Sequence, residues 1–327
     1  MKIGMCSYNF VGLLSKGALS VEEMFRMLHE WGCSHIEISD FTLPVYEGDM
    51  PERLREYSQQ YQVEIAGLNF GSDIARLSGD AYKKELEILE HKLDVAASIG
   101  ATASRIDLVR ITGFGGRADG TVVGGTEDFE AVFDGIVRAA QDLCDYQAQY
   151  GKFISSENHG IMFNGADRMR RVYAAVNRPN YGITMDIGNS LCVGEDPLVL
   201  TGELLPLARR VHVKDFYIRS KEEGLAIGAE DLSGDYLDTP GVIGHSGWIV
   251  SRYGDYLRGA IVGQGDLPMA LIAEKIVSSG YDGRDGKEGY LSVEFEGIED
   301  PIYGSRTGLR SLRNLLEACS TDTVRIC

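Results

Sequence analysis

The strongest constraint on the fold is a regular alternation of short β-like runs with amphipathic helical runs along the 327 residues. Several helical runs end at a glycine, as helices commonly do. Eight βα units without a long linker predict an α/β fold of the (β/α)₈ TIM-barrel type, in a single domain over residues 1–327. The expected strands are Lys2–Asn9, His35–Ile38, Val63–Phe70, Ala103–Leu108, Lys152–Glu157, Tyr181–Asp186, Val211–Val213 and Tyr290–Phe295.

Two segments depart from this repeat. Phe216–Gly265 lies between the seventh strand and the last barrel helix and, at about fifty residues, is far longer than an ordinary βα loop. We expect an insertion that acts as a lid or substrate-specificity element, with an oligomer contact as the alternative. Gly113–Gly125 is glycine-rich but lacks the spacing of a phosphate-binding loop, so we expect a mobile loop at the barrel mouth.

Composition narrows the class of protein and its partners. The chain is 44% apolar and 25% charged, which is typical of a soluble globular protein. Its net charge of −17 argues against nucleic acid and anionic membranes as partners. No transmembrane run or signal peptide is expected. The six cysteines form no C-x-x-C pair, which favours reduced, mostly buried thiols and a cytoplasmic location.

Four of the expected strands end on a side chain that can bind a metal: Glu157, Asp186, His212 and Glu294. Each alone could instead cap a helix or belong to the core. Because parallel barrel strands bring their carboxyl ends to one mouth, we expect the four to converge on one divalent cation. Three carboxylates and an imidazole, with no cysteine, favour Mn²⁺ and leave Co²⁺, Mg²⁺ or Zn²⁺ open.

Further polar residues lie near these strand ends. His159 is close to Glu157 and is expected to act as an acid or base, with a structural role as the alternative. Strand alternation places Glu296 on the same face as Glu294, which makes it a fallback ligand. The expected substrate contacts are Asn189, Lys214, Asp215, Arg105 and Glu296.

Five short motifs follow one another along the second half of the chain: Glu157-Asn158-His159-Gly160, Asp186-Ile187-Gly188-Asn189, Val211-His212-Val213-Lys214-Asp215, Gly263-Gln264-Gly265-Asp266 and Ser292-Val293-Glu294-Phe295-Glu296-Gly297. With the motifs in this order, the chain resembles the xylose isomerase-like TIM-barrel superfamily, the sugar-phosphate isomerase and epimerase group. Each motif is weak alone. Together the motifs are specific for the superfamily, but they distinguish poorly between its members.

The resemblance implies roles for individual residues. Ketose 3-epimerases of this group bind their metal with Glu, Asp, His and Glu, which match Glu157, Asp186, His212 and Glu294, and the two glutamates exchange the substrate proton. Asn189 stands where a substrate-binding histidine is common, and Lys214 replaces a common arginine. The long segment after the seventh strand resembles that of the catalytic subunits of C-glycoside deglycosidases.

The resemblance implies a divalent-metal-dependent sugar isomerase or epimerase that acts on a keto-sugar through proton abstraction and a metal-stabilised enediolate. The alternative is a lyase that acts on a 3-keto-glycoside or keto-sugar by enolisation and elimination. An apurinic-site endonuclease fits poorly with six histidines and the acidic charge, and a non-catalytic sugar-binding barrel stays open. The expected partners are a small-molecule sugar or keto-glycoside and further copies of the chain, joined by a small second subunit if the deglycosidase interpretation holds.

Overall fold

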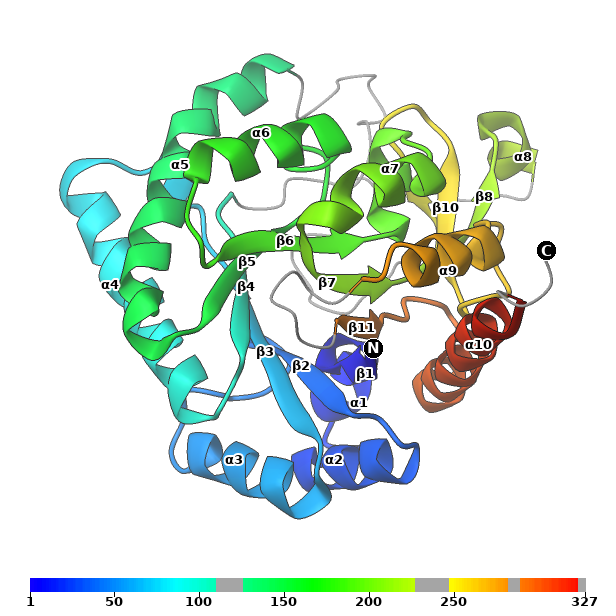
Figure 1. Ribbon diagram of the computed structural model, residues 1–327, viewed down its shortest axis with the longest axis horizontal. Helices are drawn as coiled ribbons and strands as arrows, with labels where there is room; N and C mark the ends of the chain where they lie inside the picture. The colour runs from blue at the N-terminus through cyan, green and yellow to red at the C-terminus, as the bar shows by residue number, and fades with distance from the viewer. Residues whose placement is uncertain (110–125, 227–246, 282–288, 323–327) are drawn as a thin grey trace.

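The computed structural model describes residues 1–109, 126–226, 247–281 and 289–322 (Figure 1). Eight parallel strands close into a barrel in the order β1-β11-β7-β6-β5-β4-β3-β2, which confirms the predicted (β/α)₈ fold. The barrel strands are β1 (Lys2–Cys6), β2 (His35–Ser39), β3 (Glu64–Gly71), β4 (Ala103–Asp107), β5 (Phe153–Glu157), β6 (Tyr181–Asp186), β7 (Ala208–Val213) and β11 (Tyr290–Val293).

Helices surround the barrel, and local sequence explains where several of them begin. Ser20 caps the first long helix, with Glu23 completing a capping box. A proline occupies the first turn of α3 and of α7, where its missing N–H costs nothing. The helices are α1 (Val11–Leu14), α2 (Val21–Glu30), α3 (Met50–Tyr61), α4 (Gly79–Ser98), α5 (Thr126–Gln147), α6 (Ala166–Val176), α7 (Pro197–Leu204), α9 (Met269–Ser278) and α10 (Pro301–Asp322).

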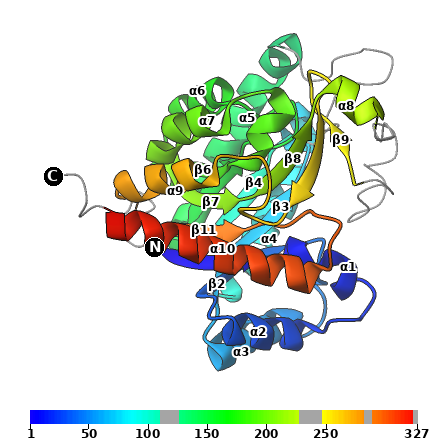
Figure 2. The ribbon, with the colours of Figure 1, turned by 90° about the vertical axis from the view of Figure 1, so that its right-hand side faces the viewer.

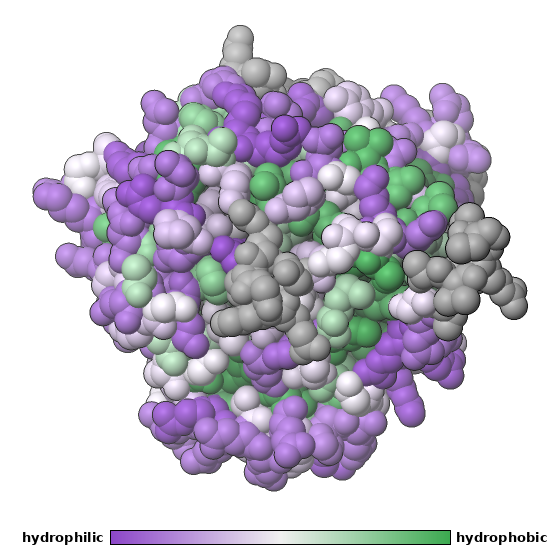
Figure 3. All heavy atoms as spheres, in the orientation of Figure 1, coloured by the Kyte–Doolittle hydropathy of each residue, from purple (hydrophilic) through white to green (hydrophobic). Residues whose placement is uncertain are grey.

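The rim of one face of the molecule is mainly polar. In the space-filling view, hydrophilic residues cover most of the helical rim, and hydrophobic residues show between the helices (Figure 3). Four cysteines of the described chain are buried free thiols, and Cys319 is partly buried, in line with the predicted thiols; Cys327 lies outside the described residues. Among the helices described, none is long and apolar enough to span a membrane.

The interior of the barrel is unusually polar. Barrel cores are commonly filled by Val, Ile and Leu, but here His35 and Arg210 fill part of the space and are fully or almost fully buried. Two glycines make room for them. A Cβ atom on Gly67 would lie 2.1 Å from Arg210 Nη1, and one on Gly4 would lie 2.2 Å from the His35 carbonyl oxygen. The small residues therefore keep a polar layer inside the barrel.

The chain between β7 and α9 folds into a sheet of its own. β8 (Asp215–Arg219) and β9 (Ile249–Val250) both pair with β10 (Tyr256–Ala260) in antiparallel fashion, and α8 (Lys221–Ala226) follows β8. Figure 2 shows these elements together on one side of the barrel. The predicted insertion thus contains a three-stranded sheet, while residues 227–246 within it lie outside the described chain, as does the expected loop at 113–125.

Candidate metal centre

The four strand-end residues meet at one place. Glu157 and Asp186 are the last residues of β5 and β6, His212 is the penultimate residue of β7, and Glu294 directly follows β11. All four are buried, and their ligand atoms lie within 4.8 Å of one another. The His212 Nδ1 atom lies 3.2 Å from Glu157 Oε1 and 3.3 Å from Glu294 Oε1. The convergence expected from parallel strand ends is therefore present.

This donor set fits a divalent cation. Buried carboxylates need a positive partner, because burial penalises the charged form. Burial raises the pKa of Asp186 to about 7, and the nearby Glu157 and Glu294 add to the effect while Lys214 opposes it. In the part of the chain that the structure describes, the buried Asp186 Oδ2 accepts no hydrogen bond, although Lys214 Nζ lies 3.1 Å away. Three carboxylates and one imidazole nitrogen suit Mn²⁺, Mg²⁺, Co²⁺ or Zn²⁺.

Lys214 is a buried cation at the edge of this set. Its Nζ lies 2.8 Å from Glu294 Oε2 and 2.9 Å from Glu296 Oε1. Burial acts to lower the pKa of Lys214, but Asp186, Glu294 and Glu296 outweigh it and raise the pKa well above its ordinary value. Lys214 therefore stays charged. The structure places both Lys214 and Glu296, two of the expected substrate contacts, beside the four potential ligands.

Asn189 connects two of the potential ligands. Its side-chain Nδ2 donates to Glu157 Oε1 at 3.2 Å, and its backbone N–H donates to Asp186 Oδ1 at 2.8 Å. Asn158, next to Glu157, exchanges two hydrogen bonds with the backbone of Asp186. These amides hold the ends of β5 and β6 in one arrangement, so Asn189 lies at the centre as expected from its motif.

Arg105, in β4, pairs with carboxylates on both sides. Its Nη1 lies 2.7 Å from Asp107 Oδ2 and 2.9 Å from Glu157 Oε2. His159 Nδ1 lies 3.5 Å from the same Asp107 oxygen. Asp107, Glu157 and His159 form a second group of possible metal ligands, but the guanidinium of Arg105 already provides a positive charge between two of them. Sequence reasoning missed Asp107, although it ends its strand on a carboxylate as Glu157 and Asp186 do.

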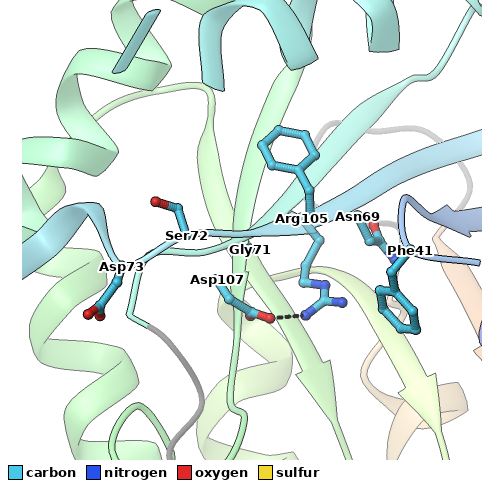
Figure 4. A pocket seen from close by; sticks show the side chains of 8 residues that line it. Phe41, Asn69, Gly71, Ser72, Asp73, Arg105 and Asp107 are labelled. Atoms are coloured by element: carbon cyan, nitrogen blue, oxygen red, sulfur yellow. Dashed lines mark hydrogen bonds and ion pairs between the residues drawn. The ribbon is translucent and has the colours of Figure 1, made fainter. Parts of the chain in front are cut away.

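A cavity of about 360 Å³ opens beside Arg105 (Figure 4). β3 and β4 pair in register at Asn69 with Arg105 and at Gly71 with Asp107, and these four residues line it together with Phe70. The half-exposed ring of Phe41 also lines it. Arg105 lines this cavity and pairs with Glu157, so it connects the cavity to one of the four potential ligands. Its size lies within the usual range of small-molecule pockets.

Asp215 is not part of this centre. Its carboxylate accepts the backbone N–H groups of Gly263 at 2.9 Å and Gly265 at 3.0 Å, as well as those of Phe216 and Leu267. Among the described residues, no ion pair or hydrogen bond joins its side chain to the four potential ligands. Asp215 therefore fixes the Gly-Gln-Gly turn against the start of β8, and the structure does not bring this expected substrate contact to the others.

Glu37, in β2, is a residue of the centre that sequence reasoning missed. It is fully buried, and its Oε2 lies 3.3 Å from His212 Nε2, the ring nitrogen opposite the one that faces Glu157 and Glu294. A signal was available in the sequence. His35, Glu37 and Ser39 alternate with isoleucines, and in a barrel covered by helices the polar face of such a strand points inward.

Comparisons with known proteins agree with the fold. The model of the family described as xylose isomerase-like TIM barrel matches residues 25–315, and the chain belongs to this family. A probable 3-DHS dehydratase from Bacillus anthracis superposes with a TM-score of 0.67 at 19% identity, over 96% of this chain and 99% of the other. A search of curated proteins found no match.

Two epimerase structures are similar in the same way. The 3-keto-D-glucoside 4-epimerase of E. coli superposes with a TM-score of 0.64 at 15% identity, over 96% of this chain and 99% of the other. The D-allulose 3-epimerase of a Methylomonas species superposes with a TM-score of 0.65 at 16% identity, over 97% and 98%. At these identities the likeness establishes the fold, and the chemistry is argued from the site.

Proposed function

We propose that the protein is a divalent-metal-dependent isomerase or epimerase of a keto-sugar, with Mn²⁺ as the first choice of metal. The observation that carries the proposal is the arrangement of Glu157 and Glu294. Each has one oxygen next to His212 Nδ1 and the other next to a buried cation, Arg105 or Lys214. Two strands lie between β5 and β11 in the barrel, so the two carboxylates approach the centre from different sides.

The bound cation would supply Lewis-acid stabilisation of the negative charge that develops when a proton leaves the carbon next to a carbonyl. Glu157 removes that proton or returns one, and Glu294 does the same from its own side of the substrate. This proton exchange either inverts the stereocentre or moves it to the neighbouring carbon. Arg105 opposes the effect of burial and helps to hold the pKa of Glu157 well below its ordinary value. Lys214 acts in the same way on Glu294. Both glutamates are therefore ionised and ready to accept a proton.

The cavity beside Arg105 would hold the part of the sugar that does not react. Asp107 and Ser72 line it and offer hydrogen-bond partners for hydroxyl groups. Arg105 would then contact both the substrate and Glu157. The similarity to epimerases of D-allulose and of a 3-keto-D-glucoside supports a substrate of this class.

Proton exchange with solvent tests the proposal. The protein is loaded with Mn²⁺ and incubated in D₂O with a panel that includes D-fructose, D-allulose and a 3-oxo-glucoside. Deuterium incorporation next to the carbonyl is expected, and chelation of the metal should abolish it. Glu157→Gln and Glu294→Gln should each lower the exchange rate by about 10²-fold or more. No exchange with any member of the panel would count against enolisation.

A lyase is the second proposal, and one contact favours it. His159 Nδ1 lies 3.5 Å from Asp107 Oδ2 and two residues from Glu157, where it could protonate a leaving group after enolisation. The dehydratase from Bacillus anthracis shows the same fold. A 3-oxo-glucoside with a chromogenic aglycone distinguishes the two proposals. Release of the aglycone supports elimination, whereas deuterium uptake without release supports the epimerase.

A further inference from the structure

The two ring nitrogens of His212 face different surroundings. Nδ1 faces the potential ligands Glu157 and Glu294, while Nε2 faces Glu37 Oε2 at 3.3 Å. Glu37 belongs to β2 and His212 to β7, with β1 and β11 between them in the barrel, so the contact crosses the interior. Neither side chain is exposed to solvent.

We propose that Glu37 is a positioning residue, which holds His212 in the tautomer that carries its proton on Nε2 and thereby presents the lone pair of Nδ1 to a divalent metal. The inference rests on the metal centre of the proposed function and assigns a role to a residue outside the ligand set. Carboxylates that orient a metal-binding histidine in this way commonly raise metal affinity 10–100-fold.

The surroundings of Glu37 fix its role as an acceptor. Arg210 Nη1 lies 3.2 Å and Asn69 Nδ2 3.3 Å from its Oε2, and the hydroxyl of Ser292 donates to its Oε1. Because a guanidinium can only donate, and three donors already converge here, Glu37 is present as a carboxylate and has no proton to give. The hydrogen of the His212 contact must therefore come from Nε2. Nδ1 also faces two carboxylates, those of Glu157 and Glu294, so without a metal it too carries a proton. A divalent metal bound there would take the place of that proton and use the Nδ1 lone pair, while the proton on Nε2 stays in the contact with Glu37.

Glu37 is also held rigidly. Arg210 is fully buried, its Nη2 lies 3.0 Å from Thr102 Oγ1, and Gly67 leaves the space that its guanidinium needs. On the other side, Ser292 Oγ is 2.8 Å from His35 Nε2. A further neighbour of the imidazole is the Cys6 thiol, with Sγ 3.8 Å from Nε2. Sulfur is a weak acceptor, so Cys6 cannot replace Glu37 in fixing the ring.

Metal affinity tests the role of Glu37. Titration calorimetry with Mn²⁺ should show binding to Glu37→Gln that is 10–100-fold weaker than to the wild type. Glu64→Gln is the matched control, because Glu64 pairs with Lys2 and Tyr290 at the start of β3 and its side chain makes no described contact with His212. It should bind Mn²⁺ as the wild type does. If Glu37→Gln does not fold because Arg210 is left unpaired, the double variant Glu37→Gln with Arg210→Gln is measured instead. The double variant removes both charges.

A second measurement does not depend on a variant. Nitrogen-15 NMR of histidine-labelled wild-type protein with Zn²⁺ should show the metal on Nδ1 of His212 and a retained proton on Nε2. Coordination through Nε2 would overturn the inference, as would unchanged Mn²⁺ affinity of a folded Glu37 variant. If the wild type binds neither Mn²⁺ nor Zn²⁺, the metal centre of the proposed function fails together with the inference. If the wild type binds and the variant binds equally well, the inference alone fails.

Discussion

The Lys214 Nζ atom lies 2.8 Å from Glu294 Oε2, and both side chains are more than nine-tenths buried. Arg105 forms the equivalent pair with Glu157. The two proposed bases therefore have partners of different chemistry, because an arginine offers a planar fork of donors whereas a lysine is a compact point charge. The difference makes the two sides of the site distinguishable by mutation.

Replacement of Lys214 by methionine should strengthen metal binding and weaken catalysis. The variant removes a positive charge that lies about 3 Å from the ligand oxygens of Asp186 and Glu294, so repulsion of the cation falls and Mn²⁺ should bind at least about tenfold more tightly. The solvent exchange rate of a keto-sugar should fall by about 10²-fold. Calorimetry and NMR measure the two quantities. Lys2→Met, which removes an ion pair at the far end of the barrel, should change neither.

Replacement of Arg105 by glutamine should destabilise the protein strongly. The change leaves the half-buried carboxylate of Asp107 and the buried carboxylate of Glu157 side by side without their cation, and breaking a buried pair in this way costs about 3–5 kcal/mol. Arg178→Gln removes an exposed pair with Asp145 and should cost less than about 1 kcal/mol. Urea unfolding of both metal-free variants gives the two values. Equal losses would contradict the buried role of Arg105.

Asp215 should act on stability and not on substrate binding. Asp215→Ala leaves the N–H groups of Gly263 and Gly265 without their acceptor and should lower the free energy of unfolding by about 2 kcal/mol. The KM of a turned-over sugar should stay within about threefold of the wild-type value. Asp266→Ala, which loses hydrogen bonds in an exposed neighbouring position, is the control. A selective rise in KM for Asp215→Ala would restore it as a substrate contact.

The contribution of Glu64 to stability should depend on pH. Partial burial acts to raise the pKa of Glu64, but hydrogen bonds from Lys2 and Tyr290 outweigh it and hold the pKa below the ordinary value of 4.5. A lowered pKa in the folded state means that the stabilisation is complete above pH 4.5 and is lost as the pH falls further. Glu64→Gln should therefore be less stable than the wild type by about 1 kcal/mol at pH 7. The gap should close at acidic pH in thermal unfolding.

The sequence was sufficient to predict the barrel, because the alternation of strand and helix patterns extends over the whole chain. It also predicted the meeting of Glu157, Asp186, His212 and Glu294, since all four follow from one geometric rule about strand ends. The rule has nothing to say about residues in the middle of a strand. Glu37 contacts His212 across the barrel, and only the closed sheet shows which strands face each other.

Asp215 shows the opposite limit of prediction from the sequence, because a residue next to a site residue in the chain need not share the site. Its place directly after Lys214 suggested a shared role, but the chain leaves the barrel at this point, and β8 begins at Asp215. Hydrogen bonds from the backbone N–H groups of Gly263 and Gly265 then determine the environment of the Asp215 carboxylate. Hydrogen bonds to a distant turn leave no local pattern in the sequence. The same applies to the pairing of β8 with β10, which joins segments that are about forty residues apart along the chain.

The strands β8, β9 and β10 pair with one another and with no barrel strand among the described residues, while the barrel closes through β7 and β11 without them. The exposed positions of this sheet can therefore vary without loss of a barrel hydrogen bond, whereas Phe216, Ile249 and Leu257 belong to the main hydrophobic core. Relatives that share the four potential metal ligands would then be free to diverge at the exposed positions of this sheet, and new substrate preferences could arise there by small insertions. Transplanting residues 215–260 between relatives is accordingly a practical route to enzymes with altered preferences.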